Sequence, residues 1–157
     1  MKIEIDQFTK SCERYKIFCL LIENQKIIDL VVNLETEGVK SINIGKELAI
    51  YIDNLEDFSY LNIDVYDYVK NILDEHKSKI NGKGNDVIAI YNLGILMEPN
   101  LELNAVQLFK EFSKSTSLII LWDNKFDMPD RLEWSTQKNN FFLDFSQSQL
   151  KKLEYAI

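Results

Sequence analysis

The chain has 157 residues, a net charge of −7 and 46% hydrophobic residues, which is the size and composition of one globular domain with a buried core. No apolar run approaches the roughly 20 residues that a membrane span requires. The segment Met1–Asp6 alternates charged residues with Ile and does not resemble a signal peptide. These features predict a cytoplasmic protein that does not contact a membrane.

Acidic residues crowd the stretch from Asp53 to Glu75, in which Lys70 is the only basic residue. Such a surface repels a phosphate backbone, so the sequence argues against direct binding of nucleic acid. An acidic face of this kind either docks on a basic protein or keeps the chain in solution.

Hydrophobic spacing and turn residues divide the first half of the chain into alternating helices and strands. The expected elements are a short helix over Asp6–Arg14, a strand over Tyr15–Ile22, a helix from Ile27 to Glu37-Gly38, a strand over Val39–Ile44 and a helix over Lys46–Leu55.

The second half continues the same alternation after an irregular stretch, Glu56–Ile63. The expected elements are a long helix capped by Asp64 and running to Lys79, a turn at Asn81–Gly84, a strand over Asp86–Leu93, a helix from Ala105 to Phe112 and a strand over Leu118–Trp122. Arg131–Ser135 and Asn140–Phe145 form either a pair of short strands or one strand and an extended edge, and a helix over Gln147–Tyr155 follows.

The two apolar runs at Asp86–Leu93 and Leu118–Trp122 are typical of strands buried on both faces, and the helix between them makes them a parallel pair. We therefore expect residues 1–157 to form a single α/β domain with three layers, in which helices flank a mainly parallel sheet. In such sheets a site forms where strands end. The residues there are Tyr91-Asn92 and Asp123-Asn124.

Nucleotide binding requires a glycine-rich turn, a Lys for the outer phosphates and a Ser or Thr for magnesium. The turn after the first predicted strand is Glu23-Asn24-Gln25-Lys26, which contains neither glycine nor a hydroxyl group. Tyr91 and Asn92 stand where a hydrolysing site needs acidic residues. The sequence thus predicts no ATP hydrolysis, no cofactor and no catalytic residue. These six residues are at most the vestige of a nucleotide site, because Lys26 is explained at least as well as a solvated lysine at a helix start.

Other chemistries find little support. His76, the only histidine, lies on or near the apolar stripe of the long helix, which favours a partly buried structural role over catalysis. Cys12 and Cys19 are far from a CxxC spacing, so we expect buried thiols.

Four aspartates could form the carboxylate set of a metal-dependent nuclease, although solvated acids in a polar loop are the favoured explanation. They are Asp123, Asp127, Asp130 and Asp144. Aromatic residues also gather in the last third of the chain, where core packing with an exposed rim for a partner is favoured over base stacking. They are Trp122, Phe126, Trp134, Phe141, Phe142 and Phe145.

Several short motifs together resemble the small P-loop protein of bacteriophage-exclusion (BREX) defence islands, known as BrxF. The motifs are Ser41–Ala49, Asp86–Pro99, Leu108–Thr116, Leu118–Trp122, Leu132–Ser135 and Phe141–Phe145, so the resemblance covers most of the chain from Tyr15 to Phe145. It departs from the family at the phosphate loop, here Glu23–Lys26, and at the magnesium-side acid, here Tyr91 with Asn92 kept.

The resemblance implies an AAA-like or RecA-like fold and a role beside other proteins of a phage-defence system. Our leading hypothesis is a non-catalytic pseudo-ATPase that acts as an adaptor or regulator through protein contacts, with a homo-oligomer as one possible state. The alternatives are a divergent ATPase that completes its site from a neighbouring subunit and a metal nuclease that uses the aspartates after Trp122.

Overall fold

The computed structural model describes residues 5–22, 26–123, 126–127, 131–135, 140–145 and 151–154. For residues 126–127, 134–135 and 151–154 only the backbone is described.

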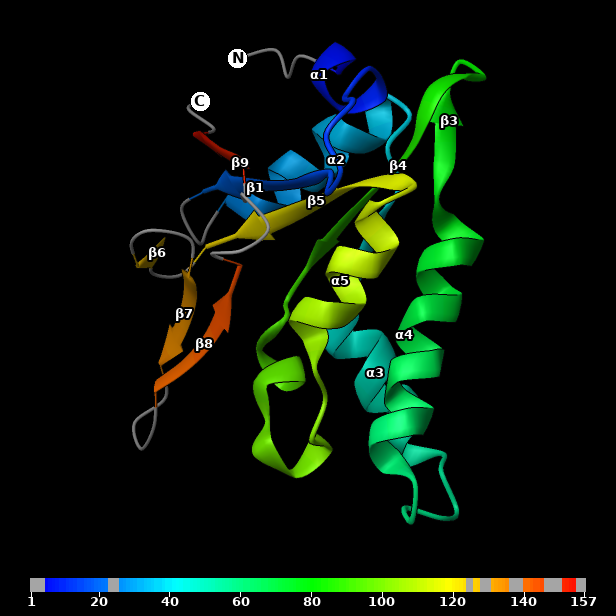
Figure 1. The fold of residues 1–157 in the computed structure, drawn as a ribbon, viewed down its shortest axis with the longest axis vertical. Helices are drawn as coiled ribbons and strands as arrows, with labels where there is room; N and C mark the ends of the chain where they lie inside the picture. Colours follow the sequence, from blue (N-terminus) through cyan, green and yellow to red (C-terminus); the bar gives the residue numbers. More distant parts are fainter. Residues whose placement is uncertain are drawn as a thin grey trace.

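Within these residues, the main sheet has six strands, of which five are parallel in the order β2-β4-β5-β1-β9 (Figure 1). The sixth, β3 (Ser78–Ile80), pairs antiparallel with β4. The bounds of the parallel strands are β1 Ile17–Leu21, β2 Ser41–Asn43, β4 Lys83–Tyr91, β5 Thr116–Trp122 and β9 Lys151–Glu154. β4 and β5 pair in parallel, with Ile88 opposite Leu118, which confirms the predicted parallel pair.

The three inner strands of this sheet are buried on both faces, as their continuous apolar runs predict. Successive side chains alternate between two cores, since Ile88 of β4 lies in one core and Ala89 in the other. The fold is therefore α/β with a mainly parallel sheet flanked by helices.

Helices cover the two faces unequally. On one face lie α1 (Asp6–Thr9) and α2 (Ile27–Thr36), which bury Phe8, Leu30 and Leu34. On the other lie α3 (Ile44–Asp53), α4 (Leu61–His76) and α5 (Ala105–Ser113) (Figure 1). Two 3₁₀ turns, η2 (Gly94–Met97) and η3 (Pro99–Leu101), connect β4 to α5.

A second, antiparallel sheet of three strands lies beyond the end of β5 (Figure 1). It comprises β6 (Phe126–Asp127), β7 (Arg131–Ser135) and β8 (Asn140–Asp144), and it confirms the first of the two predicted alternatives, a pair of short strands. The buried side chains of Leu132 and Leu143 pack this sheet against the core that α3, α4 and α5 cover.

The predicted helix over Gln147–Tyr155 is wrong where the chain is described, because residues 151–154 form β9, parallel to β1. β1 would otherwise leave an open edge of unpaired backbone groups, and β9 satisfies them. The hydrophobic spacing of this segment suits a helix, but pairing with the distant strand β1 decides its structure.

The long helix ends at His76, not Lys79, because Ser78–Ile80 form β3, antiparallel to β4. Asn81 and Gly82 have positive φ values of 54° and 69°, as a tight hairpin turn requires. Asn81 and Gly82 therefore form the turn of a β-hairpin between β3 and β4, where the sequence predicts a turn between a helix and a strand.

Three other predicted boundaries are wrong. α4 begins at Leu61 after Tyr60, so Asp64 lies inside the first turn and is not the cap. α1 ends at Thr9, well before Arg14. The predicted strand over Val39–Ile44 is shorter because Asn43 already caps the next helix. Across the described residues, no helix combines the length and apolarity needed to cross a bilayer.

Candidate functional site

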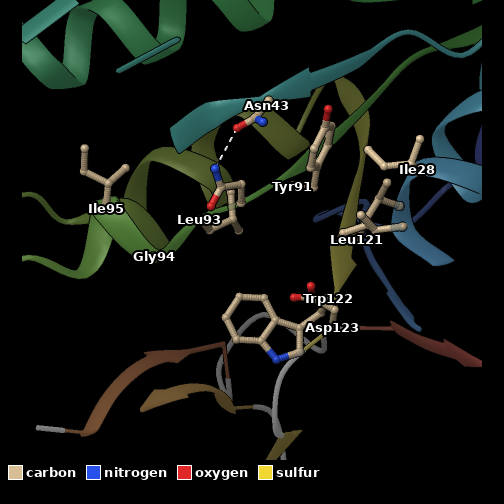
Figure 2. Close-up of a pocket in the computed structure, with 11 residues that line it drawn as sticks. Ile28, Asn43, Tyr91, Leu93, Gly94, Ile95, Leu121, Trp122 and Asp123 are labelled. Carbon is tan, nitrogen blue, oxygen red and sulfur yellow. Dashed lines mark hydrogen bonds between the residues drawn. The ribbon is translucent and has the colours of Figure 1, made fainter. Parts of the chain in front are cut away.

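A cavity of about 500 Å³ opens at the carboxyl ends of the central strands (Figure 2). It lies where β4 and β5 end and where α2 begins. Its lining residues are Ile27, Ile28, Asn43, Tyr91, Asn92, Leu93, Gly94, Ile95, Leu121, Trp122 and Asp123. This is the end of a parallel sheet at which ligands bind in open α/β folds.

The polar groups on the β4 side of the cavity are engaged with one another. The Asn92 side-chain amide donates a hydrogen bond of 2.8 Å to Asn43 Oδ1 (Figure 2). The same oxygen accepts a 3.0 Å hydrogen bond from the Lys46 backbone N–H and so caps α3. These side chains consequently join the end of β4 to the end of β2 and to the start of α3.

Gly45 and Asn92 are fitted to each other at this junction. A Cβ atom on Gly45 would overlap the side-chain amide of Asn92, so the close approach requires glycine. Asn92 itself has a φ of 58°, a left-handed conformation that asparagine tolerates better than most residues. The site position occupied by Asn92 is therefore built for a structural contact.

Tyr91, which precedes Asn92, is half-buried and lines the cavity beside Leu121 and Ile28 of α2 (Figure 2). The Trp122 side chain is buried against the second sheet, in the same core as Leu132 and Phe145. Asp123, half-buried, follows at the end of β5.

Asp123 is the one lining residue with a formal charge among the described residues that line the cavity. A phosphate chain would meet this carboxylate and no lining Lys or Arg in that set. The described part of the cavity is therefore poorly suited to a polyphosphate.

Lys26 stands at the N-terminus of α2, where its side chain does not cap the helix. It is not one of the residues that line the cavity with Tyr91 and Asn92. Glu23, Asn24 and Gln25 lie outside the described residues.

The nuclease set is only partly described, because Asp130 and the side chain of Asp127 lie outside the described residues. Where side chains are described, no group of three or more His, Cys, Asp or Glu residues converges to hold a metal ion.

His76 is exposed at the end of α4, with Nδ1 2.7 Å from the Ile72 carbonyl oxygen, so its predicted partial burial in the stripe is wrong. Its ring hydrogen-bonds the backbone of its own helix, which makes it part of the helix end. Cys19 is buried as predicted, whereas Cys12 is exposed, because the helix that would have buried it ends three residues earlier.

The aromatic residues in the last third of the chain include both buried and exposed side chains. Trp122 and Phe145 are buried, while Phe142 is 42% exposed and carries the Arg131 guanidinium 4.3 Å from its ring centroid. The side chains of Phe126 and Trp134 lie outside the described residues.

Asn43 is the site residue that the sequence analysis missed. A signal for it exists, since an Asn three residues before Lys46 is a typical helix N-cap. The alternation of Ile42 and Ile44 continues across Asn43, so the local pattern predicts a strand at this position and not a helix cap.

Comparison of the chain with protein-family models, with curated proteins and with solved structures finds no match.

Proposed function

We propose that this chain is a non-catalytic pseudo-ATPase, an α/β scaffold that works through protein contacts as an adaptor or regulator in a bacterial phage-defence complex. The observation that carries the proposal is the Asn43–Asn92 hydrogen bond at the end of β4. Tyr91 and Asn92 stand at the two positions where a hydrolysing site needs acids, and the Asn92 amide bonds two strand ends together.

The parallel arrangement of the strands is compatible with the proposal. Numbered along the chain, they run fifth, first, fourth, third and second across the sheet. A mainly parallel sheet flanked by helices is compatible with the AAA-like or RecA-like fold that the resemblance to the BREX P-loop family implies. Fold alone does not define activity, so the expected absence of ATP hydrolysis depends on the residues of the site.

Calorimetric titration with ATP and magnesium tests the proposal. We expect no binding at micromolar concentrations and no rise in the melting temperature, because bound nucleotide would stabilise the folded state. Lys26→Ala should leave both measurements unchanged.

Micromolar ATP binding that disappears in Lys26→Ala but persists in Lys70→Ala would overturn the proposal. Lys70 is a suitable control because it is an exposed lysine on α4, away from the cavity. Oligomers that form only with ATP, seen by size-exclusion chromatography, would instead indicate an ATPase completed by a neighbouring subunit.

A further inference from the structure

Another hollow, of about 290 Å³, lies between the start of α4 and the segment that leads into α5. Its lining residues are Asn62, Ile63, Tyr66, Asp67, Glu102, Leu103 and Asn104, and we call this set the α4 groove. Its walls are apolar at Ile63, Tyr66 and Leu103, and its charged groups, Asp67 and Glu102, are carboxylates exposed to solvent.

Large apolar side chains stand exposed where the chain approaches the α4 groove. Phe58, Tyr60 and Ile63 are 56%, 66% and 52% exposed, within six residues of one another. Exposed apolar groups concentrated in this way mark interaction surfaces.

The segment that presents these side chains is fixed by hydrogen bonds. Asp57 accepts bonds of 2.9 and 2.6 Å from the backbone N–H and hydroxyl of Ser59. The Asp64 backbone N–H donates 2.9 Å to the Tyr60 carbonyl. A partner would therefore meet a surface that is already ordered, which reduces the entropy lost on binding.

The stretch of sequence that leads into the groove and includes the start of α4 is strongly acidic. Between Glu47 and Val69 the sequence holds no Lys, Arg or His and six carboxylates: Glu47, Asp53, Glu56, Asp57, Asp64 and Asp67. Among the described residues none of these six, nor Glu102, takes part in an ion pair. Their field reaches the neighbouring Tyr51, because Asp64 and Asp67 add to burial in raising the pKa of its hydroxyl.

We propose that the α4 groove docks a cationic amphipathic segment of another protein, whose apolar side chains enter the groove while its Lys and Arg side chains meet the acidic rim. The apolar walls and the negative charge of the groove favour a cationic amphipathic segment over other ligands. Nucleic acid and anionic membranes carry the charge of the rim, and a second copy of this chain would bring the same acidic face against it. The inference rests on the proposed adaptor function, for which it names the kind of partner.

A phage-displayed library of random peptides, selected on the full chain, tests this inference. We expect the selected peptides to combine Lys or Arg with aliphatic or aromatic residues. Their affinity should fall about tenfold in Ile63→Ser, because an apolar anchor is lost. It should fall severalfold in the double variant Asp67→Asn/Glu102→Gln, with the loss shrinking at high salt.

Two variants on α2 serve as matched controls. Val32→Ser removes an apolar side chain that is 55% exposed, and Glu35→Gln neutralises an exposed carboxylate, both outside the groove and outside the cavity at the strand ends. Neither should change peptide affinity, and unchanged melting temperatures should show that every variant folds.

The inference is overturned if no peptide is enriched, if the enriched peptides are acidic, or if Val32→Ser and Glu35→Gln weaken binding as much as the groove variants. The ATP titration remains a separate test. Nucleotide binding would end the pseudo-ATPase proposal without altering the peptide result.

Discussion

At the scale of single residues, the contact between Asn43 and Asn92 ties together two strand ends and one helix. Asn43 Oδ1 accepts from both the Asn92 side chain and the Lys46 backbone N–H. This oxygen cannot turn away from Asn92 without also giving up the helix cap. The Asn92 side chain therefore stabilises this junction by donating a hydrogen bond to Asn43.

Asn92→Asp should lower the free energy of unfolding by about 1 kcal/mol at neutral pH. The variant loses the donor and sets a carboxylate against the Asn43 oxygen. Asn92→Gly, which also loses the bond but adopts a φ of 58° without strain, should lose less. Urea unfolding followed by circular dichroism measures both variants, and an Asp variant as stable as the wild type would contradict the structural role of the amide.

At the scale of elements, α3 and α4 are joined by a stacked pair of tyrosine rings. Tyr51 and Tyr68 have centroids 4.0 Å apart and an interplanar angle of 6°. Burial is the main cause that raises both pKa values above the ordinary 10.0, and nearby carboxylates add to it. Either hydroxyl is therefore harder to ionise in the folded protein than in the unfolded chain.

This difference predicts a loss of stability in alkali. As the pH rises past 10.0, the unfolded chain releases these protons first, so it binds fewer protons than the folded state and the free energy of unfolding falls. The contribution of the two hydroxyls is complete below pH 10.0 and disappears as the pH rises through the folded-state pKa.

Denaturant unfolding at a series of alkaline pH values tests the prediction. Tyr51→Phe and Tyr68→Phe should each flatten the decline and remove a late step from the ultraviolet titration of tyrosine. Tyr60→Phe is the control, because that ring is 66% exposed. An equal effect of all three variants would show that the stacked pair is not responsible.

At the scale of the whole molecule, the sheet face under α1 and α2 has the thinner cover, and Phe8 closes it. Phe8 is fully buried and meets Phe18 edge-on, with centroids 4.9 Å apart. Its carbonyl oxygen accepts hydrogen bonds from the Ser117 hydroxyl at 2.5 Å and from the Asn85 side-chain amide at 3.3 Å. A helix of four residues is thereby fastened to the two central strands.

Phe8→Ala should cost about 3–5 kcal/mol of folding free energy, because a buried ring is lost and the short helix cannot collapse into the space. Phe58→Ala changes a ring that is 56% exposed and should shift stability by no more than about 0.5 kcal/mol. Chemical denaturation compares the two. Similar losses in both variants would mean that Phe8 does not close the core.

The sequence by itself determined the features that depend on neighbouring residues. Continuous apolar runs specified β4 and β5 as strands buried on both faces, since only an inner strand hides every side chain. The spacing of Leu108 and Phe112 specified α5 in the same way. The identities of Tyr91 and Asn92 at the end of β4 were also visible, and with them the absence of an acid pair.

Only the tertiary structure decided the features that join distant segments. Residues 151–154 carry a pattern compatible with a helix, but the unpaired edge of β1 turns them into β9. Asn43 and Asn92 are 49 positions apart, and no local pattern links them. Hydrogen bonds between remote backbone and side-chain groups lower the free energy only after the chain has folded, so local periodicity cannot reveal them.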